Sequence, residues 1–198
     1  MSKRRYEGEQ TKKHIVDKAK ILFSQKGYVS TSIQDICAAT GCSKGNLYYH
    51  FKSKEDLFLC LAEQNFTEWS EQWEKISSEY ESITEKLYAY GDFIADIERP
   101  LHSIEREFIS TVGLDSEAGQ KLFAIINISF EKFKKFMSEG IAAGELKNEN
   151  LFELTFIVSS FYSGLSRYSN LMDKDARKAL FHKATTLLLQ GIGTRNEK

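Results

Sequence analysis

The sequence predicts an all-α protein. Its 198 residues include a single proline, and no segment alternates apolar and polar residues as a half-buried strand does. Apolar residues instead recur at spacings of three and four along most of the chain, and a helix-capping residue stands before most of these segments. We expect an N-terminal three-helix domain (residues 1–52) fused to a larger helical C-terminal domain (residues 53–198).

The composition predicts a reduced, cytoplasmic protein. No stretch of about 18 apolar residues is present, so no membrane span is expected. The N-terminal segment lacks the apolar core of a secretory signal. The three cysteines have no metal-ligand spacing, and we expect no metal and no cofactor.

Charge is unevenly distributed along the chain. Residues 1–52 contain ten Lys and Arg against four Asp and Glu, a balance of +6, whereas residues 53–198 carry a balance of −7. This asymmetry suggests that the N-terminal part alone meets a polyanion. Chance clustering of surface lysines is the alternative explanation.

The N-terminal domain is expected to contain three helices after a basic, mobile arm (residues 1–9). The first covers residues 10–26 and ends at Gly27. The second begins at Thr31, which is expected to cap it in a capping box with Gln34, and ends at Gly41. Ser43 caps the short third helix. The predicted core consists of Ile15, Leu22, Phe23, Ile33, Ile36, Leu47 and Phe51.

The third helix combines a small apolar face with a crowded polar surface. Leu47 and Phe51, four residues apart, face inward. The other faces carry Lys44, Asn46, Tyr48, Tyr49, His50 and Lys52. Aromatic and basic side chains at this density are typical of a helix that lies in the major groove of DNA.

Six further helices are expected in the C-terminal domain. Ser53 and Asp56 start a long helix that continues through Trp73 and joins the two domains without a flexible linker. Three more begin at Ser82, Pro100 and Ser116. The last two begin at Asn148 or Asn150 and at Asp173, and the final helix ends at Gly191.

Three segments of the N-terminal region carry a family resemblance. They read A-K-I-L-F-S-Q-K-G-Y, T-S-I-Q-D-I and T-G-C-S-K-G-N-L-Y-Y-H-F-K-S-K-E-D-L. Together they resemble the signature of the tetracycline-repressor (TetR) family of transcriptional regulators over about residues 10–60. The resemblance implies an all-α homodimer with a helix-turn-helix head and a C-terminal domain that binds a small molecule and supplies the dimer interface. Cys42 departs from the family pattern, which often has an aliphatic residue there.

The resemblance and the residue pattern agree on the surface that would bind DNA. Lys44, Gly45, Asn46 and Tyr48 lie at the start of the third helix, where base edges are read. Asn46 suits adenine and Lys44 suits guanine, although either side chain could contact phosphate instead. Helix N-termini in this region suit a phosphate group, because their backbone N–H groups are free. The further DNA-binding candidates, some of which lie at such N-termini, are Thr31, Ser32, Ser43, Tyr49, His50, Lys52 and Lys54.

The C-terminal domain is rich in large aromatic residues, most of which would fill its core. The resemblance implies an apolar ligand cavity with a few polar groups among them. The ligand-binding candidates are Phe66, Trp69, Tyr88, His102, Phe108, Phe123, Asn127, Phe130, Phe156 and Ser159. The candidates for the dimer interface are Phe161, Leu165, Tyr168, Leu180 and Leu187, with burial inside one subunit as the alternative.

The sequence thus predicts a regulator, favoured by the resemblance to be a repressor. It would bind a palindromic operator as a homodimer and be released by a small, largely apolar molecule. Two alternatives remain: a thiol-based redox regulator that uses Cys37 or Cys42, and a helical adaptor that binds protein but not DNA. An enzyme is not indicated, since the four histidines are scattered and no nucleophile–base pair or phosphate loop is present.

Overall fold

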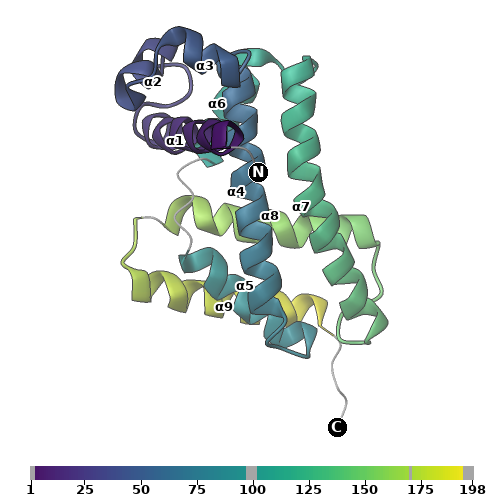
Figure 1. Cartoon of the computed structure of the whole chain (residues 1–198). Helices are drawn as coiled ribbons and strands as arrows, with labels where there is room; N and C mark the ends of the chain where they lie inside the picture. The colour runs from purple at the N-terminus through teal and green to yellow at the C-terminus, as the bar shows by residue number, and fades with distance from the viewer. Residues whose placement is uncertain (1–2, 97–101, 170, 194–198) are drawn as a thin grey trace. The chain divides into compact units, whose positions relative to one another are not determined.

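The computed structural model describes residues 3–96, 102–169 and 171–193, with side chains placed at all of these except 3–5, 102, 103 and 168. Within these ranges the chain forms α-helices and no β-strand (Figure 1). One isolated antiparallel bridge joins Leu146 and Gly193. The predicted all-α class is confirmed. The helices are α1 (Lys3–Lys26), α2 (Ile33–Thr40), α3 (Lys44–His50), α4 (Lys54–Ser77), α5 (Ile83–Asp96), α6 (His102–Val112), α7 (Glu117–Ala142), α8 (Leu151–Ser169) and α9 (Lys174–Ile192).

The N-terminus differs from the expected mobile arm. Helix α1 begins at Lys3, and the Thr11 hydroxyl donates to the Glu7 carbonyl at 2.9 Å, one turn earlier. The segment consists largely of Lys, Arg, Glu and Gln, which are good helix formers. One glycine, Gly8, costs a helix only about 1 kcal/mol, so it does not separate an arm from α1.

The predicted capping residues account for most of the helix starts. A hydroxyl, amide or carboxylate oxygen of the cap residue accepts a backbone N–H from the first turn of the helix, and each such bond stabilises a helix by about 1 kcal/mol. Caps of this kind are found at Ser43, Ser53, Ser82, Ser116, Asn150 and Asp173. The sequence offers both Asn148 and Asn150 as possible N-caps of α8. In the structure Asn150 is the cap.

The chain packs as two compact units. Unit 1 holds the described residues within 1–67 and 99–126, and unit 2 holds those within 68–98 and 127–198. Helices α4 and α7 each contribute residues to both units. The packing division does not fall at the expected boundary after residue 52, because Leu57, Phe58 and Leu61 of α4 belong to the same core as α1–α3.

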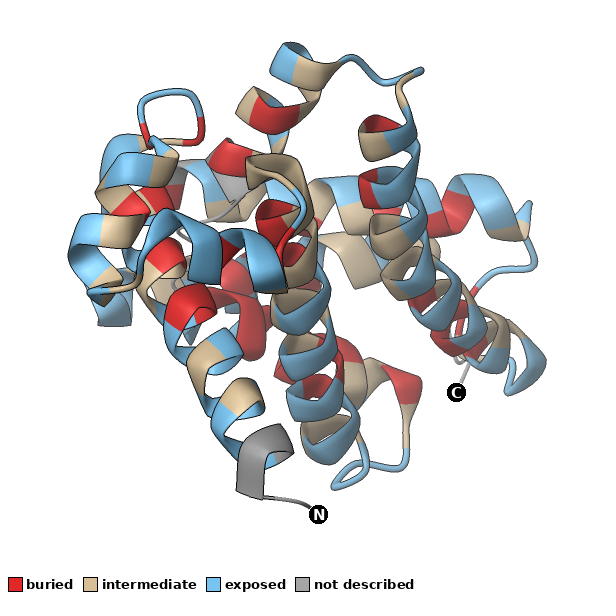
Figure 2. Ribbon diagram, turned by 45° about the horizontal axis from the view of Figure 1, so that its top comes forward, coloured by how far each residue is buried: buried red, intermediate tan, exposed pale blue. Residues whose placement is uncertain are grey.

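The core of unit 1 joins the three N-terminal helices to α6 and the starts of α4 and α7. Ile36 and Leu47 are the buried residues of α2 and α3, and further buried residues come from α1, α4, α6 and α7 (red in Figure 2). Tyr28, in the loop between α1 and α2, packs its ring 5.3 Å from Phe58 of α4 and 4.9 Å from Phe108 of α6, measured between centroids. The core of the N-terminal head (helices α1–α3) is therefore completed by helices that come later in the chain.

The core of unit 2 forms mainly where α5 packs against α8 and α9. Tyr162 of α8 is 1% exposed, and its hydroxyl donates to the Leu87 carbonyl at 3.1 Å and lies 2.9 Å from the Thr185 hydroxyl. Burial raises the pKa of Tyr162 well above its usual range. These buried hydroxyls satisfy one another, so the junction costs little of the desolvation that an unpaired hydroxyl would impose. No helix within the described ranges is long and apolar enough to cross a membrane.

Candidate nucleic-acid interface

One face of α3 is fixed to the core of unit 1. Leu47 is fully buried, and Phe51, which follows the helix, is 2% exposed. The Ser43 hydroxyl accepts a hydrogen bond from the Asn46 N–H at 3.1 Å. Two apolar anchors and one cap thus hold this short helix in place. An isolated helix of this length would not be stable in water.

The other face of α3 lies open to solvent. Its exposed residues are Ser43, Lys44, Gly45, Asn46, Tyr48 and Tyr49. Tyr49 is 84% exposed and Tyr48 is 44% exposed. The Lys44 ammonium lies 5.8 Å from the Tyr48 ring centroid, a cation–π distance that brings the two side chains together. This face presents donors, a cation and two aromatic rings to whatever approaches it.

His50 and Lys52 continue this surface beyond α3. The half-buried His50 ring packs edge-on against the Tyr49 ring, with centroids 5.1 Å apart. The Lys52 side chain is exposed, while its backbone N–H donates to the Asp56 carboxylate at 2.9 Å. The backbone between α3 and α4 is thereby held in place, and the Lys52 side chain projects from a fixed point.

The start of α2 corrects one prediction. Ser32, not Thr31, is the N-cap: its hydroxyl accepts the Asp35 N–H at 3.1 Å, and the Asp35 carboxylate accepts the Ser32 N–H at 2.8 Å. Thr31 is fully buried, and its hydroxyl donates to the Gly27 carbonyl at 2.7 Å. Thr31 therefore neither caps α2 with Gln34 nor offers its side chain to DNA.

Asp35 gathers hydrogen bonds at the N-terminus of α2. The Ser32 hydroxyl donates to its carboxylate at 2.6 Å, and the Lys26 ammonium does so at 2.9 Å. The bonds from the Ser32 hydroxyl and N–H, and then that from Lys26, hold the pKa of Asp35 well below its usual range. Ser32 thus serves a capping box, and a DNA contact from it stays a prediction.

Lys54 has a different environment from the one predicted. Its ammonium donates to the Tyr28 and Thr31 carbonyls at 2.9 and 3.0 Å and lies 4.2 Å from the Tyr28 ring centroid. The prediction of a lysine that reaches outward to phosphate is therefore corrected. Lys54 ties α4 to the α1–α2 loop, and a phosphate contact from it would require this clamp to open.

Glu107 of α6 holds the other side of the same loop, a role that the sequence did not indicate. Its two carboxylate oxygens accept the N–H groups of Tyr28 and Val29, each at 2.9 Å. Gly27 has a φ of +81°, and a Cβ there would lie 2.7 Å from the Glu107 Oε2. No sequence signal links residues so far apart, since the pairing depends on how α6 packs beside the head.

The three cysteines all lie in unit 1 and are half-buried. Cys37, Cys42 and Cys60 pack against its core. Burial raises the pKa of the Cys60 thiol, which lowers its thiolate fraction at neutral pH and hence its reactivity. Among the described residues, no group of three or more His, Cys, Asp or Glu side chains is arranged to hold a metal ion.

Three of the ligand-binding candidates from unit 1, Phe66, Phe108 and Phe123, differ in their burial. Phe108 is fully buried in the core of unit 1, with its ring 4.5 Å from that of Phe58, so assigning it to a ligand cavity was wrong. Phe123 is 59% exposed, and Phe66 is half-buried. The side chain of His102 lies outside the described residues.

The candidates in unit 2 are dispersed. The Tyr88 hydroxyl lies 2.9 Å from the Thr186 hydroxyl, and its ring packs beside His182. Phe130 and Phe156 both pack against Phe152, at the surface of α7 and α8. Two more candidates, exposed Asn127 and half-buried Ser159, lie on these same helices.

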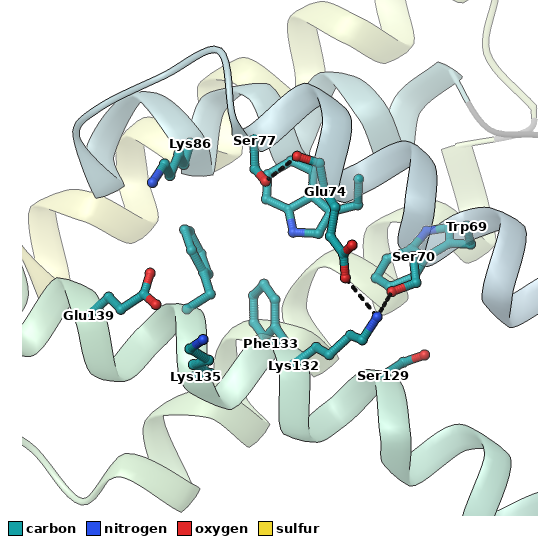
Figure 3. Close-up of a pocket in the computed structure, with 12 residues that line it drawn as sticks. Trp69, Ser70, Glu74, Ser77, Lys86, Ser129, Lys132, Phe133, Lys135 and Glu139 are labelled. Carbon is teal, nitrogen blue, oxygen red and sulfur yellow. Dashed lines mark hydrogen bonds and ion pairs between the residues drawn. The ribbon is translucent and has the colours of Figure 1, made fainter.

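Trp69 is the candidate that lines a cavity described in unit 2. This cavity has a volume of about 360 Å³ and lies among the end of α4, the start of α5 and the second half of α7 (Figure 3). Trp69, Trp73, Phe133 and Phe136 supply its aromatic lining. The sequence did not predict the charged residues that surround these rings.

The candidates for the dimer interface occupy α8 and α9. Phe161 and Leu165 are partly buried against the core of unit 2, and Leu180 is also half-buried. Leu187 is 58% exposed. The side chain of Tyr168 lies outside the described residues. Phe152, Phe156 and Ile157 of α8, each 57–58% exposed, were not among the predicted interface residues.

Two family models match the chain. One, described as bacterial regulatory proteins of the tetR family, matches residues 15–61, and the other, described as the C-terminal region of QacR-like proteins, matches residues 65–194. Among curated proteins, the HTH-type transcriptional regulator QacR of Staphylococcus aureus is 28% identical over 183 residues, which cover 91% of this chain and 97% of that protein. The HTH-type regulator AcrR of Shigella flexneri is 48% identical over 56 residues, or 28% of this chain and 26% of AcrR.

Solved structures share the fold. A TetR transcriptional regulator from Chloroflexus aurantiacus superimposes with a TM-score of 0.78 at 23% identity, covering 96% of this chain and 100% of that one. The regulator FadR of Bacillus subtilis, solved in complex with stearoyl-CoA, superimposes with a TM-score of 0.71 at 21% identity, covering 90% and 98% of the two chains.

Proposed function

Because this chain belongs to the TetR family of bacterial transcriptional regulators, we propose that it represses transcription by binding a palindromic operator as a homodimer. A small, largely apolar effector that binds unit 2 releases it. The exposed face of α3 is the observation that carries this proposal, since it presents polar and aromatic groups on a helix anchored from behind by Leu47 and Phe51. Such a helix fits the width of the major groove.

Individual side chains of this face have distinct roles. Lys44 and Asn46 read base edges, as a cation pairs with guanine acceptors and an amide pairs with adenine. Gly45 allows the backbone to approach the groove. Tyr48, Tyr49, His50 and Lys52 contact the sugar-phosphate backbone beside it, and these contacts fix the register without reading sequence.

The dimer forms through α8 and α9. Exposed Phe156, Ile157 and Leu187 support this proposal, since three large apolar side chains on adjacent helices of a free subunit would otherwise face water. A Cβ at Gly164 would meet no atom within 4 Å, so this point of α8 is open to a helix of a second subunit. A two-fold dimer presents two α3 helices to an inverted repeat.

The effector acts by changing the spacing of these two helices. Glu107 of α6 and Lys54 of α4 support this step, because both hold the α1–α2 loop of the head. A shift in either helix would carry the head with it. The effector must favour the spacing that does not fit the operator, since equal affinity for both spacings would leave DNA binding unchanged.

Genomic DNA fragments retained by the pure protein would test the DNA-binding proposal. Asn46→Ala should relax base preference at one position of each half-site, at a cost of about 1–3 kcal/mol for the preferred base. Tyr49→Ala should weaken binding to all fragments by a similar factor. Equal affinity of both variants and the parent protein for every fragment would contradict the assignment of α3.

A further inference from the structure

We propose that the cavity of unit 2 binds an amphipathic anion: a flat aromatic body that carries one carboxylate. The proposal rests on the proposed function, because it names the chemical class of the effector. The cavity volume of about 360 Å³ falls within the range of small-molecule sites in proteins. All the residues that line it belong to unit 2.

Ring-to-ring packing holds the aromatic lining of the cavity in place. Trp73 packs its ring 4.9 Å from Tyr90, 5.9 Å from Phe93 and 6.0 Å from Phe136, measured between centroids. Trp69 also packs against Tyr90 and Phe93, with centroids 6.2 and 5.9 Å apart. Rings packed in this way are held in place before a ligand arrives, which lowers the entropic cost of binding an aromatic ligand beside them.

One pair of charges in the cavity is already neutralised. The Lys132 ammonium donates to the Glu74 carboxylate at 2.7 Å and to the Ser70 hydroxyl at 2.6 Å, as Figure 3 shows. Glu74 is therefore occupied by a lysine on the facing helix. A cationic ligand would have to displace Lys132 to reach this carboxylate.

The remaining charges favour an anion. Lys86, Lys135 and Glu139 line the opposite end of the cavity in Figure 3, which leaves an excess of one positive charge there. Among the described residues, no ion pair within 4 Å engages Lys135. Lys86 also attracts the Glu145 carboxylate electrostatically. That carboxylate, however, already accepts the N–H groups of Ile83 and Thr84, each at 3.0 Å. Glu139 offsets one of the two lysines, so one further carboxylate beside Lys86 and Lys135 would balance the charge at this end.

The chain supplies its own reporter for this site. It contains two tryptophans, Trp69 and Trp73, and both line the cavity. Intrinsic tryptophan fluorescence of the whole protein, measured without DNA, therefore reports occupancy directly. Phenylpropanoate, phenylpropanol and phenylpropylammonium are suitable probes, since they share one aromatic body and differ in charge.

Phenylpropanoate should change the fluorescence with at least about tenfold higher affinity than phenylpropylammonium, with the alcohol between them. The double variant Lys86→Gln/Lys135→Gln should remove about tenfold of the affinity for the anion and leave that for the alcohol unchanged. Lys134→Gln is the matched control, because Lys134 lies beside Lys135 on α7 but pairs with Glu131 at 3.1 Å and does not line the cavity.

Several results would overturn the proposal. Tighter binding of the ammonium would assign the cavity to cations, and equal anion affinity in the double variant and the parent would remove the lysines from the site. No fluorescence change with any probe, in a protein that still retains DNA, would reject the cavity but not the proposed repressor. Loss of DNA retention on phenylpropanoate saturation supports an effector role, whereas undiminished retention contradicts it.

Discussion

Lys52 and Lys54 stand two residues apart at the start of α4, yet their side chains have different surroundings. The Lys52 side chain is exposed, whereas the Lys54 ammonium is bonded to two carbonyls of the α1–α2 loop. A sequence shows the two lysines as equivalent, because which of them turns inward depends on where the loop carbonyls lie. The same holds for Thr31 and Ser32, of which the structure buries one and exposes the other.

Replacing each lysine by methionine should separate stability from DNA binding. Lys54→Met should lower the free energy of unfolding by about 1–3 kcal/mol, since it removes charged hydrogen bonds and leaves the Thr31 carbonyl without its Lys54 donor, whereas the Tyr28 carbonyl still accepts the Thr31 N–H at 3.4 Å. Lys52→Met should leave stability within about 0.5 kcal/mol and weaken DNA binding, with a smaller salt dependence. Urea unfolding and fluorescence anisotropy with an operator fragment measure the two effects. Equal stability of both variants would contradict the clamp.

Asp35 makes the stability of the head depend on acid pH. Hydrogen bonds from Ser32 and Lys26 depress the pKa of its carboxyl group in the folded state. A group with a depressed native pKa contributes stability above its usual pKa of 3.8 and loses it as the pH falls toward the native value. The stability difference between the parent protein and Asp35→Asn should therefore be constant at neutral pH and shrink below about pH 4. A difference that does not change with pH would contradict this assignment.

Helix α6 completes the N-terminal head (α1–α3) by holding the α1–α2 loop through Glu107. The helices themselves follow from the sequence: caps at Ser43, Ser82, Ser116 and Asp173 and apolar spacing identify them. The contact between α6 and the loop could not be predicted from the sequence. Nothing in the sequence around Glu107 indicates that its carboxylate accepts the backbone N–H groups of residues 28 and 29. For the same reason Phe108, which resembles a ligand-cavity residue in sequence, belongs to the core of unit 1.

A double-mutant cycle on Gly27 and Glu107 tests this contact. Gly27→Ala should destabilise the protein by about 1–2 kcal/mol through its positive φ, and by more because the new Cβ displaces Glu107. In a Glu107→Ala background the second part disappears, so the two effects should not add. Gly41→Ala is the control, because Gly41 also has a positive φ, +68°, but no atom lies within 4 Å of its Cβ position. Additive effects at Gly27 and Glu107 would reject the coupling.

The proposed repression of a palindromic operator requires two subunits. Apolar spacing in the sequence predicts that the last two helices, α8 and α9, form the dimer interface. That spacing does not distinguish side chains that pack into the core of their own subunit from side chains that remain exposed. Phe161 and Leu165 pack against the core of unit 2. Phe156, Ile157 and Leu187 are exposed. Burial in a single chain is a three-dimensional property, so it separates these two sets where periodicity cannot.

Leu187→Glu should convert the dimer to a monomer and reduce operator affinity, because it places a charge in an apolar interface. Its helix content should be unchanged, since Leu187 is 58% exposed in the single subunit. Leu171→Glu, the same substitution at a residue that is 92% exposed between α8 and α9, should remain dimeric. Sedimentation velocity of both variants measures the result. A dimeric Leu187→Glu would exclude this face of α9 from the interface.

A hydroxyl-radical footprint on a genomic fragment retained by the pure protein tests whether a symmetric dimer reads DNA through α3. Two copies of α3 related by a two-fold axis should protect two half-sites of an inverted repeat, with centres about 10 base pairs or a multiple of this apart. In the same experiment, Asn46→Ala should lose protection in both half-sites together. Protection of one isolated half-site, or of a direct repeat, would contradict a symmetric dimer that reads DNA through α3.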